Sequence, residues 1–136
     1  MTIGPMSEGK EQQMLVWRLD DRRGTLPVHA VERVLPAMAV QAVAAAPVKL
    51  MGIVRLQGRA LPVVDLRRHL AEPARELRPS DRLVLLKNGP WRFGLFVDTV
   101  EDVLIANGPG APPALDVDGL YSEDDQRRLA ALGVQT

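Results

Sequence analysis

The hydrophobic residues of this chain fall into short runs, and residues that favour turns separate the runs from one another. Residues 14–19, MLVWRL, predict a strand, in which the period of two places Leu15, Trp17 and Leu19 on one face. Residues 51–56 and 60–64 are rich in β-branched and apolar side chains. The glycine of the Gln57–Gly58 turn between these two runs predicts a hairpin.

A second hairpin is predicted farther along the chain. Residues 81–87 and 91–98 are apolar over most of their length, and Asn88–Gly89 between them is a strong turn signal. Residues 101–106, EDVLIA, predict one further strand, because an apolar run follows directly on two acidic residues.

Three other segments carry mixed signals. Residues 25–35, TLPVHAVERVL, begin as an extended segment and are expected to include a helical turn through Val31 and Val34. Residues 39–49 contain alanines that permit a helix, but a proline near their end disfavours it, so a loop is predicted. Residues 114–117, ALDV, predict a short last strand.

Two helices are predicted from their capping residues. Asp65 precedes the apolar-basic run LRRHL, where its carboxylate can accept hydrogen bonds from otherwise unpaired backbone N–H groups. Near the end of the chain, Ser122 stands at an N-cap position, acidic residues fill the first turn, and Gly133 ends the helix.

These elements define the fold class. At least six short strands with only brief helices predict an all-β fold with minor helical content, built as an antiparallel barrel or sandwich. The length of 136 residues and the hydrophobic content of 46% suit one domain. We expect this domain to span residues 14–136, and residues 1–13 to form a disordered N-terminal tail.

Composition narrows the function class. The 17 basic and 17 acidic residues balance, so no overall charge favours nucleic acid or a membrane surface. The absence of cysteine excludes disulfides and thiolate chemistry. The N-terminus lacks the apolar run of a signal peptide, and no apolar segment approaches the roughly 20 residues that span a bilayer. We therefore expect a cytoplasmic protein with no membrane insertion.

The charges are balanced in number but not in position. Residues 55–82 contain seven arginines and four acidic residues, whereas residues 98–125 contain eight acidic residues and neither lysine nor arginine. Two solvated faces are the simpler interpretation. The alternative is two surfaces that bind different partners through charge complementarity.

A search for catalytic or metal-binding residues finds no consistent set. His29 and His69 lie in different predicted elements, without the spacing of a metal site. Asp65 and Asp98 each close a strand, where a side-chain acceptor stabilises a chain reversal, so we expect structural roles for both. Aromatic residues make up only 4% of the chain, too few for a stacking surface for nucleic acid. A non-enzymatic binding module without metal or cofactor is the class that remains.

Three sequence blocks resemble CheW-like domains. The first is LMGIVRLQGRALPVVDLRRHL, residues 50–70, in which a glycine-led strand, a short turn and a PVVDLR strand follow in order. The others, in the same order as in the family, are MLVWRLDDRRGTLPVHAVERVL, residues 14–35, and DRLVLLKNGPWRFGLFVDTVEDVL, residues 81–104. The resemblance implies two small SH3-like β-barrels that share a hydrophobic seam. It also implies a non-catalytic adaptor that couples chemoreceptors to the histidine kinase CheA.

The resemblance further implies where partners bind. Gly52 and the turn Gln57–Gly58, flanked by Arg59, fall where the family meets the receptor. Val31 and Glu32 lie in a segment that the family uses for docking. The expected partners are the regulatory domain of a CheA-type kinase and the cytoplasmic tip of a chemoreceptor.

The sequence departs from the family pattern in two places. Gln57 replaces an arginine that many members carry, and its uncharged amide cannot form the same forked ion pair. After residues 101–106 the family has a longer stretch with another strand or hairpin, so we expect the second barrel to be trimmed. An incomplete barrel leaves an edge or apolar face uncovered, which we expect self-association or a partner to close. The alternative function is therefore a divergent module that binds a kinase or an array-positioning partner without receptor coupling.

Overall fold

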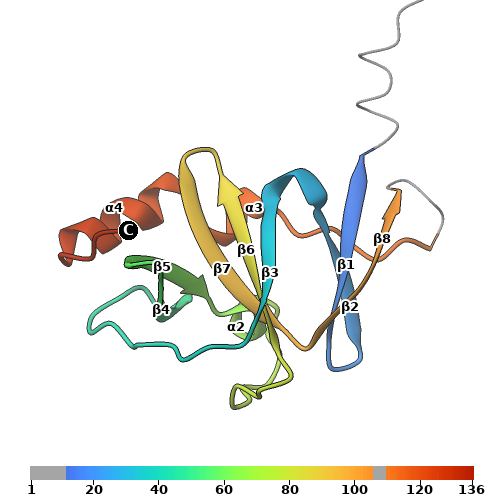
Figure 1. Ribbon diagram of the computed structural model, residues 1–136, viewed down its shortest axis with the longest axis horizontal. Coiled ribbons are helices and arrows are strands. Elements are labelled where there is room, and N and C mark those ends of the chain that lie inside the picture. Colours follow the sequence, from blue (N-terminus) through green and yellow to red (C-terminus); the bar gives the residue numbers. More distant parts are fainter. Residues whose placement is uncertain (1–11, 106–109) are drawn as a thin grey trace, which may run out of the picture.

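The computed structural model describes residues 12–105 and 110–136, whose strands form two β-sheets (Figure 1). The strands are β1 (Gln13–Leu19), β2 (Arg22–Pro27), β3 (Val31–Pro36), β4 (Leu50–Leu56), β5 (Arg59–Val64), β6 (Arg82–Asn88), β7 (Trp91–Val97) and β8 (Thr99–Ile105). The helical elements are the 3-10 turn η1 (Val28–Ala30) and the helices α2 (Leu66–His69), α3 (Val117–Leu120) and α4 (Glu123–Ala131).

One sheet has three strands in the order β2-β1-β8, and the other has five in the order β3-β6-β7-β5-β4. Neighbouring strands are antiparallel except for β5 and β7, which pair in parallel. An antiparallel bridge between Gln41 and Ile53 brings the chain after β3 onto β4, so the five-stranded sheet curls toward closure. Both predicted hairpins and the all-β class with minor helical content are confirmed.

The hairpin of β6 and β7 is buried on both faces. Leu83 and Leu85 point to one side of β6 and belong to an inner cluster, whereas Val84 and Leu86 point to the other side and belong to an outer cluster. Burying each leucine side chain stabilises the fold by about 2 kcal/mol. A two-stranded hairpin cannot cover both of its own faces, so other elements must pack on each side of it.

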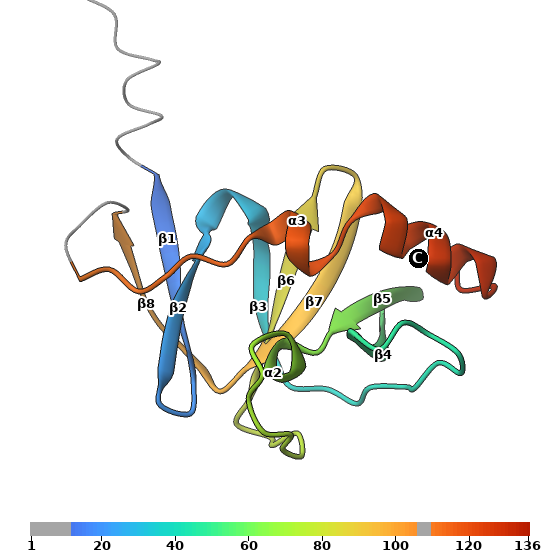
Figure 2. The same ribbon diagram turned by 180° about the vertical axis from the view of Figure 1, so that it is seen from behind.

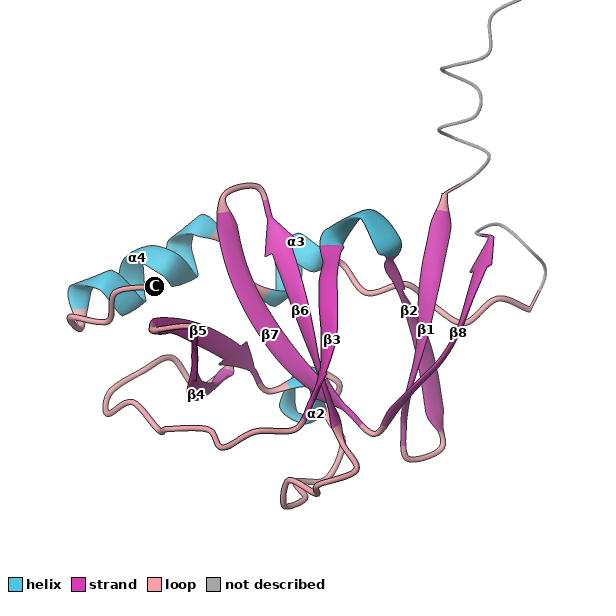
Figure 3. Cartoon of the chain, in the orientation of Figure 1, coloured by secondary structure: helices cyan, strands magenta, loops and turns pink. Residues whose placement is uncertain are grey.

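The inner cluster fills the curled five-stranded sheet. Its buried members are Val54, Leu61, Val63, Leu83, Leu85 and Phe96. The outer cluster joins the five-stranded sheet to the three-stranded sheet and to the helices, which Figure 3 shows on the outside of the sheets. Its largest fully buried side chains include Trp17, Phe93 and Tyr121.

The C-terminal segment crosses the molecule behind the sheets, from the three-stranded sheet to α4 (Figure 2). The amide of Thr25 donates to the carbonyl oxygen of Pro113 at 2.9 Å, and the amide of Leu115 donates to the carbonyl of Thr25 at 2.9 Å. Farther along, the ring of Tyr121 stacks on Phe93 with centroids 5.3 Å apart. This segment therefore fastens α3 and α4 onto the outer cluster.

The predicted last strand over residues 114–117 is wrong. Ala114 makes one isolated parallel bridge to Thr25, and Val117 already begins α3. Two prolines precede Ala114 and carry no N–H group, so they cannot donate to a ladder.

The predicted helical turn through Val31 and Val34 is also misplaced. The turn lies earlier, at η1, and Val31–Pro36 forms β3. The cause is tertiary: β3 pairs antiparallel with β6 over a long sequence separation, with Val34 opposite Val84. Such pairing outweighs local propensity. The segment after β3 is a loop, as predicted (Figure 3).

The stretch in which we expected the family's further strand to be absent follows β8, which pairs with the first strand of the chain in the three-stranded sheet. β8 lies at the edge of this sheet, and Val103 and Ile105 on it are 45% and 51% exposed. Most of the predicted N-terminal tail, residues 1–11, lies outside the described residues, as do residues 106–109, which follow β8. Within the predicted tail, Gln13 already belongs to β1.

Both predicted helices form at their capping residues. Asp65 is the N-cap of α2, and its Oδ1 accepts from the Arg68 amide at 3.1 Å. Ser122 is the N-cap of α4, and its amide donates to Oδ2 of Asp125 at 2.9 Å. No helix among the described residues is long and apolar enough to cross a membrane.

Two glycines of the first hairpin both have a positive φ but differ in the space available for a side chain, and a pair of substitutions tests this difference. Gly52 has φ +148° and an added Cβ would lie 2.2 Å from the Gln41 carbonyl oxygen, whereas Gly58 has φ +79° with open space around it. Gly58→Ala should lower the free energy of unfolding by about 1–2 kcal/mol, from backbone strain alone. Gly52→Ala should lower it by about 3 kcal/mol or more, because strain and a backbone clash add.

Urea unfolding of both variants against the wild-type chain measures these changes. Equal losses at the two positions would contradict the close approach of Gln41 to β4 that the fold requires.

Candidate protein-interaction surface

A wide groove opens at the end of the five-stranded sheet where the turns β4–β5 and β6–β7 lie. Its volume is about 790 Å³, and we call it the barrel mouth. Residues from β3 to β7, the two turns and the C-terminal region line it. The lining side chains used below are Glu32, Arg33, Leu56, Gln57, Arg59, Leu61, Leu85, Lys87, Pro90, Trp91 and Arg92.

Three of the residues that the resemblance assigned to partner binding meet in this groove. Glu32 comes from β3, Gln57 from the turn after β4, and Arg59 from the start of β5. Gly58 lies exposed between Gln57 and Arg59, and its φ of +79° allows the tight turn that presents them. Pairing between distant strands therefore gathers residues that lie far apart in the sequence.

The two remaining predicted residues do not line the mouth. Val31 is half-buried and packs against the outer hydrophobic cluster. Gly52 is buried beneath the backbone of Gln41, and this approach leaves no room for a side chain. Neither residue is part of the groove, whose lining includes Glu32, Gln57 and Arg59.

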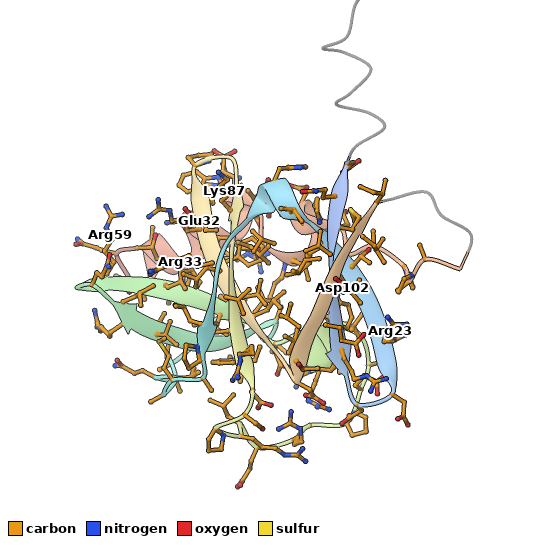
Figure 4. The ribbon with its side chains drawn as sticks, turned by 45° about the vertical axis from the view of Figure 1, so that its right-hand side comes forward. Arg23, Glu32, Arg33, Arg59, Lys87 and Asp102 are labelled. Carbon is orange, nitrogen blue, oxygen red and sulfur yellow. The ribbon has the colours of Figure 1, made fainter. Side chains whose placement is uncertain are left out.

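The mouth is strongly basic, which the predictions missed. Four lining residues are cationic, and Glu32 has the one acidic side chain among the residues that line the groove. Glu32 Oε1 lies 3.2 Å from Nε of Arg92. Figure 4 shows Glu32, Arg33, Arg59 and Lys87 grouped on one side of the molecule, away from Arg23 and Asp102 on the three-stranded sheet.

A second charged cluster lies around α2, and its hydrogen bonds join separate elements of the fold. Arg67 of α2 donates to Asp20 at 2.7 Å and to Asp98 at 3.1 Å, so it joins the β1–β2 turn to the β7–β8 junction. Arg75 donates to Asp81 through both terminal nitrogens, at 3.1 and 2.9 Å, and also to Asp98. Asp98 in addition accepts the Asp20 amide at 2.7 Å.

The ionisation of this cluster follows its geometry. The hydrogen bond from Arg67 lowers the pKa of Asp20 below its ordinary value, against a small opposing effect of burial. Burial raises the pKa of Asp81, but the hydrogen bonds from Arg75 and from the Arg78 amide more than offset it, so this pKa is lowered. Both carboxylates therefore stay charged at neutral pH.

Asp65 and Asp98, which each close a strand in the sequence, both form hydrogen bonds within the fold. Asp65 caps α2, and Asp98 is held by two arginines and a backbone amide. His29 and His69 are both exposed and lie in separate elements, η1 and α2. Within the described part of the chain, no group of three or more histidine and acidic side chains is placed to hold a metal ion.

Comparison with known proteins identifies the family. The profile of the CheW-like domain matches residues 13–121, a region that contains both sheets and α3. The chain therefore belongs to the CheW-like domain family.

Individual relatives are distant. The chain is 32% identical to protein FrzA of Myxococcus xanthus over 90 residues, which are 66% of this chain and 56% of FrzA, so the match spans little over half of that relative. It is 22% identical to the chemotaxis protein CheW of Rhizobium meliloti over 121 residues, 89% of this chain and 78% of that protein.

A solved structure agrees with the fold. The scaffolding protein TtCheW from Thermoanaerobacter tengcongensis superposes with a TM-score of 0.64 over 71% of this chain and 63% of that chain, at 23% sequence identity. The likeness shows that the two chains share the fold, a pair of SH3-like barrels.

The charged cluster at α2 predicts how stability depends on pH. Arg75→Met should lower the free energy of unfolding by about 3 kcal/mol at neutral pH, because it leaves the buried Asp81 without its counter-charge. The folded pKa of Asp81 lies below its unfolded value. The stabilisation is therefore complete above about pH 4 and is lost as the pH falls through the folded pKa.

Urea unfolding from neutral to acidic pH measures this effect. The wild-type chain should lose more stability on acidification than Arg75→Met does, and an equal loss would contradict the assigned role. Arg82→Met is the matched control, because Arg82 is exposed and, within residues 12–105 and 110–136, its side chain donates to the backbone carbonyls of Ser80 and Asp81 and to no carboxylate.

Proposed function

We propose that this protein is a non-catalytic adaptor that couples chemoreceptors to a CheA-type histidine kinase in chemotaxis-type signal transduction. The observation that carries the proposal is the match of a CheW-like domain to residues 13–121, combined with the barrel mouth that exposes Glu32, Gln57 and Arg59. The kinase regulatory domain and the receptor tip are the proposed partners, and the mouth is one docking surface.

The form of the protein supports a docking role. An adaptor needs exposed side chains held on a rigid scaffold, and strand ends and turns of a small barrel provide them. The mouth is open and about half apolar in character, with Trp91 partly exposed among charged side chains. Aromatic and arginine side chains of this kind contribute most of the binding energy at many protein interfaces.

A second candidate function is a module that binds a kinase or an array-positioning partner and has lost receptor coupling. Gln57 favours it, because the family arginine at this turn is absent. The three-stranded sheet with its exposed β8 edge favours it as well, since a contact built on the missing segment would be lost.

Complex formation with the kinase tests the adaptor function. The purified chain is mixed with the regulatory domain of the CheA-type kinase of the same organism and analysed by gel filtration with light scattering. We expect a stable mixed complex of defined mass. A folded chain that forms no complex would contradict the adaptor proposal.

The same measurement on the chain alone tests self-association. The edge strand β8, with its exposed Val103 and Ile105, predicts a concentration-dependent mass above that of the 14.9 kDa monomer. A molar mass equal to that of the monomer at all concentrations would refute self-association.

Restoring an arginine in the first turn tests receptor coupling. Gln57→Arg should strengthen binding to a chemoreceptor cytoplasmic tip by about tenfold, the effect of one charge-assisted hydrogen bond. Gln57 is exposed and already has φ +53°, so the substitution adds no new backbone demand. Isothermal titration calorimetry against the receptor fragment measures the change.

The control is Gln13→Arg, which adds the same charge at an exposed position of the three-stranded sheet. Unchanged affinity of Gln57→Arg, or an equal gain in both variants, would refute the proposed geometry and support the module without receptor coupling.

A further inference from the structure

On the strands that form the barrel mouth, the inward-facing side chains are apolar within the barrel and cationic at the end that opens into the groove. Leu83 and Leu85 of β6 belong to the inner cluster, and Lys87 follows them at the same spacing of two residues. Side chains that are two residues apart on a strand share a face of the sheet. Lys87 therefore continues the inward row of β6 beyond the apolar core.

The neighbouring strands repeat this pattern. Arg33 lies two residues before Leu35 on β3, and Arg59 lies two residues before Leu61 on β5. Leu61 belongs to the inner cluster, and Leu35 packs against it. On β7, Arg92 lies four residues before Phe96 of that cluster. Four strands thus each place one cation where the barrel interior opens into the groove: Arg33, Arg59, Lys87 and Arg92.

The positive charges of the mouth are largely uncompensated within the described residues. Only Arg92 has a carboxylate within 4.0 Å, from Glu32, whereas Arg33, Arg59 and Lys87 have none there. Lys87 and Arg92 also stand directly opposite each other in the β6–β7 ladder. Like charges in such a pair destabilise a sheet, so an anionic occupant would relieve this repulsion.

The floor of the groove is apolar. Leu56, Leu61, Leu85 and Trp91 line it together with the cations. An occupant that fits both features carries carboxylates beside apolar side chains, which is the character of a protein segment. A single-stranded nucleic acid fits less well, because such sites stack successive bases on several aromatic rings and Trp91 is the one aromatic residue in the lining.

We propose that the barrel mouth binds an acidic, partly apolar segment of a partner protein. The proposal rests on the adaptor function and deepens it by naming the chemistry of the segment. Arg33 and Arg59 can each form two parallel hydrogen bonds to one carboxylate, and Lys87 adds a point charge between them. The leucines and Trp91 bury the apolar side chains that alternate with the acidic ones.

Charge reversal in the mouth provides the direct test. The probe is a short fluorescent peptide of alternating Glu and Leu, and the readout is fluorescence anisotropy. We expect the double variant Arg33→Glu with Lys87→Glu to bind the peptide at least about tenfold more weakly than the wild-type chain, with the wild-type affinity falling as salt rises.

The matched control is Arg55→Glu with Arg68→Glu. It makes the same change in net charge at two exposed residues that do not line the mouth and form no ion pair within the described residues. Equal weakening in both double variants would overturn the proposal, because the binding would then follow net charge alone. A labelled single-stranded DNA that binds the wild-type chain more tightly than the peptide would overturn the choice of a protein segment.

Two further measurements keep the test decisive. If the double variant does not fold, Arg59→Gln and Lys87→Gln replace it, since both side chains are exposed, and each should weaken peptide binding about threefold or more. The kinase regulatory domain is titrated in parallel. If the kinase complex forms but no variant changes peptide binding, the proposal of an acidic segment is refuted and the adaptor function stands. If the mouth variants weaken peptide binding but no kinase complex forms, the adaptor function is refuted and the acidic segment stands.

Discussion

The β6–β7 hairpin must be buried on both of its faces, and this requirement organises the rest of the chain. Leu83 and Leu85 face the inside of the curled five-stranded sheet, whereas Val84 and Leu86 face outward. Exposing either row to water would cost the burial of two apolar side chains, each of about 2 kcal/mol. The three-stranded sheet, which contains β1 and β2, and the C-terminal segment both pack on the outer face of this hairpin (Figures 1 and 2).

The barrel mouth is a consequence of this double burial. Once one face of β6 and β7 is committed to the interior, the next inward positions, Lys87 and Arg92, fall at the rim of the barrel. The ion cluster of Arg67, Arg75 and Asp98 holds the junctions that fix the two sheets together. Because side chains alternate between the two faces of each strand, pairing of the strands fixes the positions of these charges at the rim. A partner segment could therefore bind them without a conformational change in the sheet.

Local signals predicted much of the fold, and long-range pairing decided the remainder. Asn88–Gly89 and Gln57–Gly58 specify their turns, and Asp65 specifies the start of α2. The strand Val31–Pro36 exists because β6 offers a pairing edge distant in sequence. Lys87 and Arg92 were not predicted to line the groove, because a hairpin with two apolar faces does not reveal from sequence which face points inward. Arg33 was missed because its segment was expected to include a helical turn and not to form β3. Spacing could identify them only after the two clusters were known.

The proposed adaptor function requires a partner to dock at the barrel mouth, and cross-saturation NMR can locate such a contact residue by residue. The isotope-labelled chain is bound to the unlabelled regulatory domain of its CheA-type kinase, and saturation is transferred from the partner to the amides at the contact. We expect intensity losses at Arg33, Gln57, Arg59 and Lys87, which line the mouth. Losses confined to β1, β2 and β8 would contradict it, because the docking surface would then lie on the three-stranded sheet.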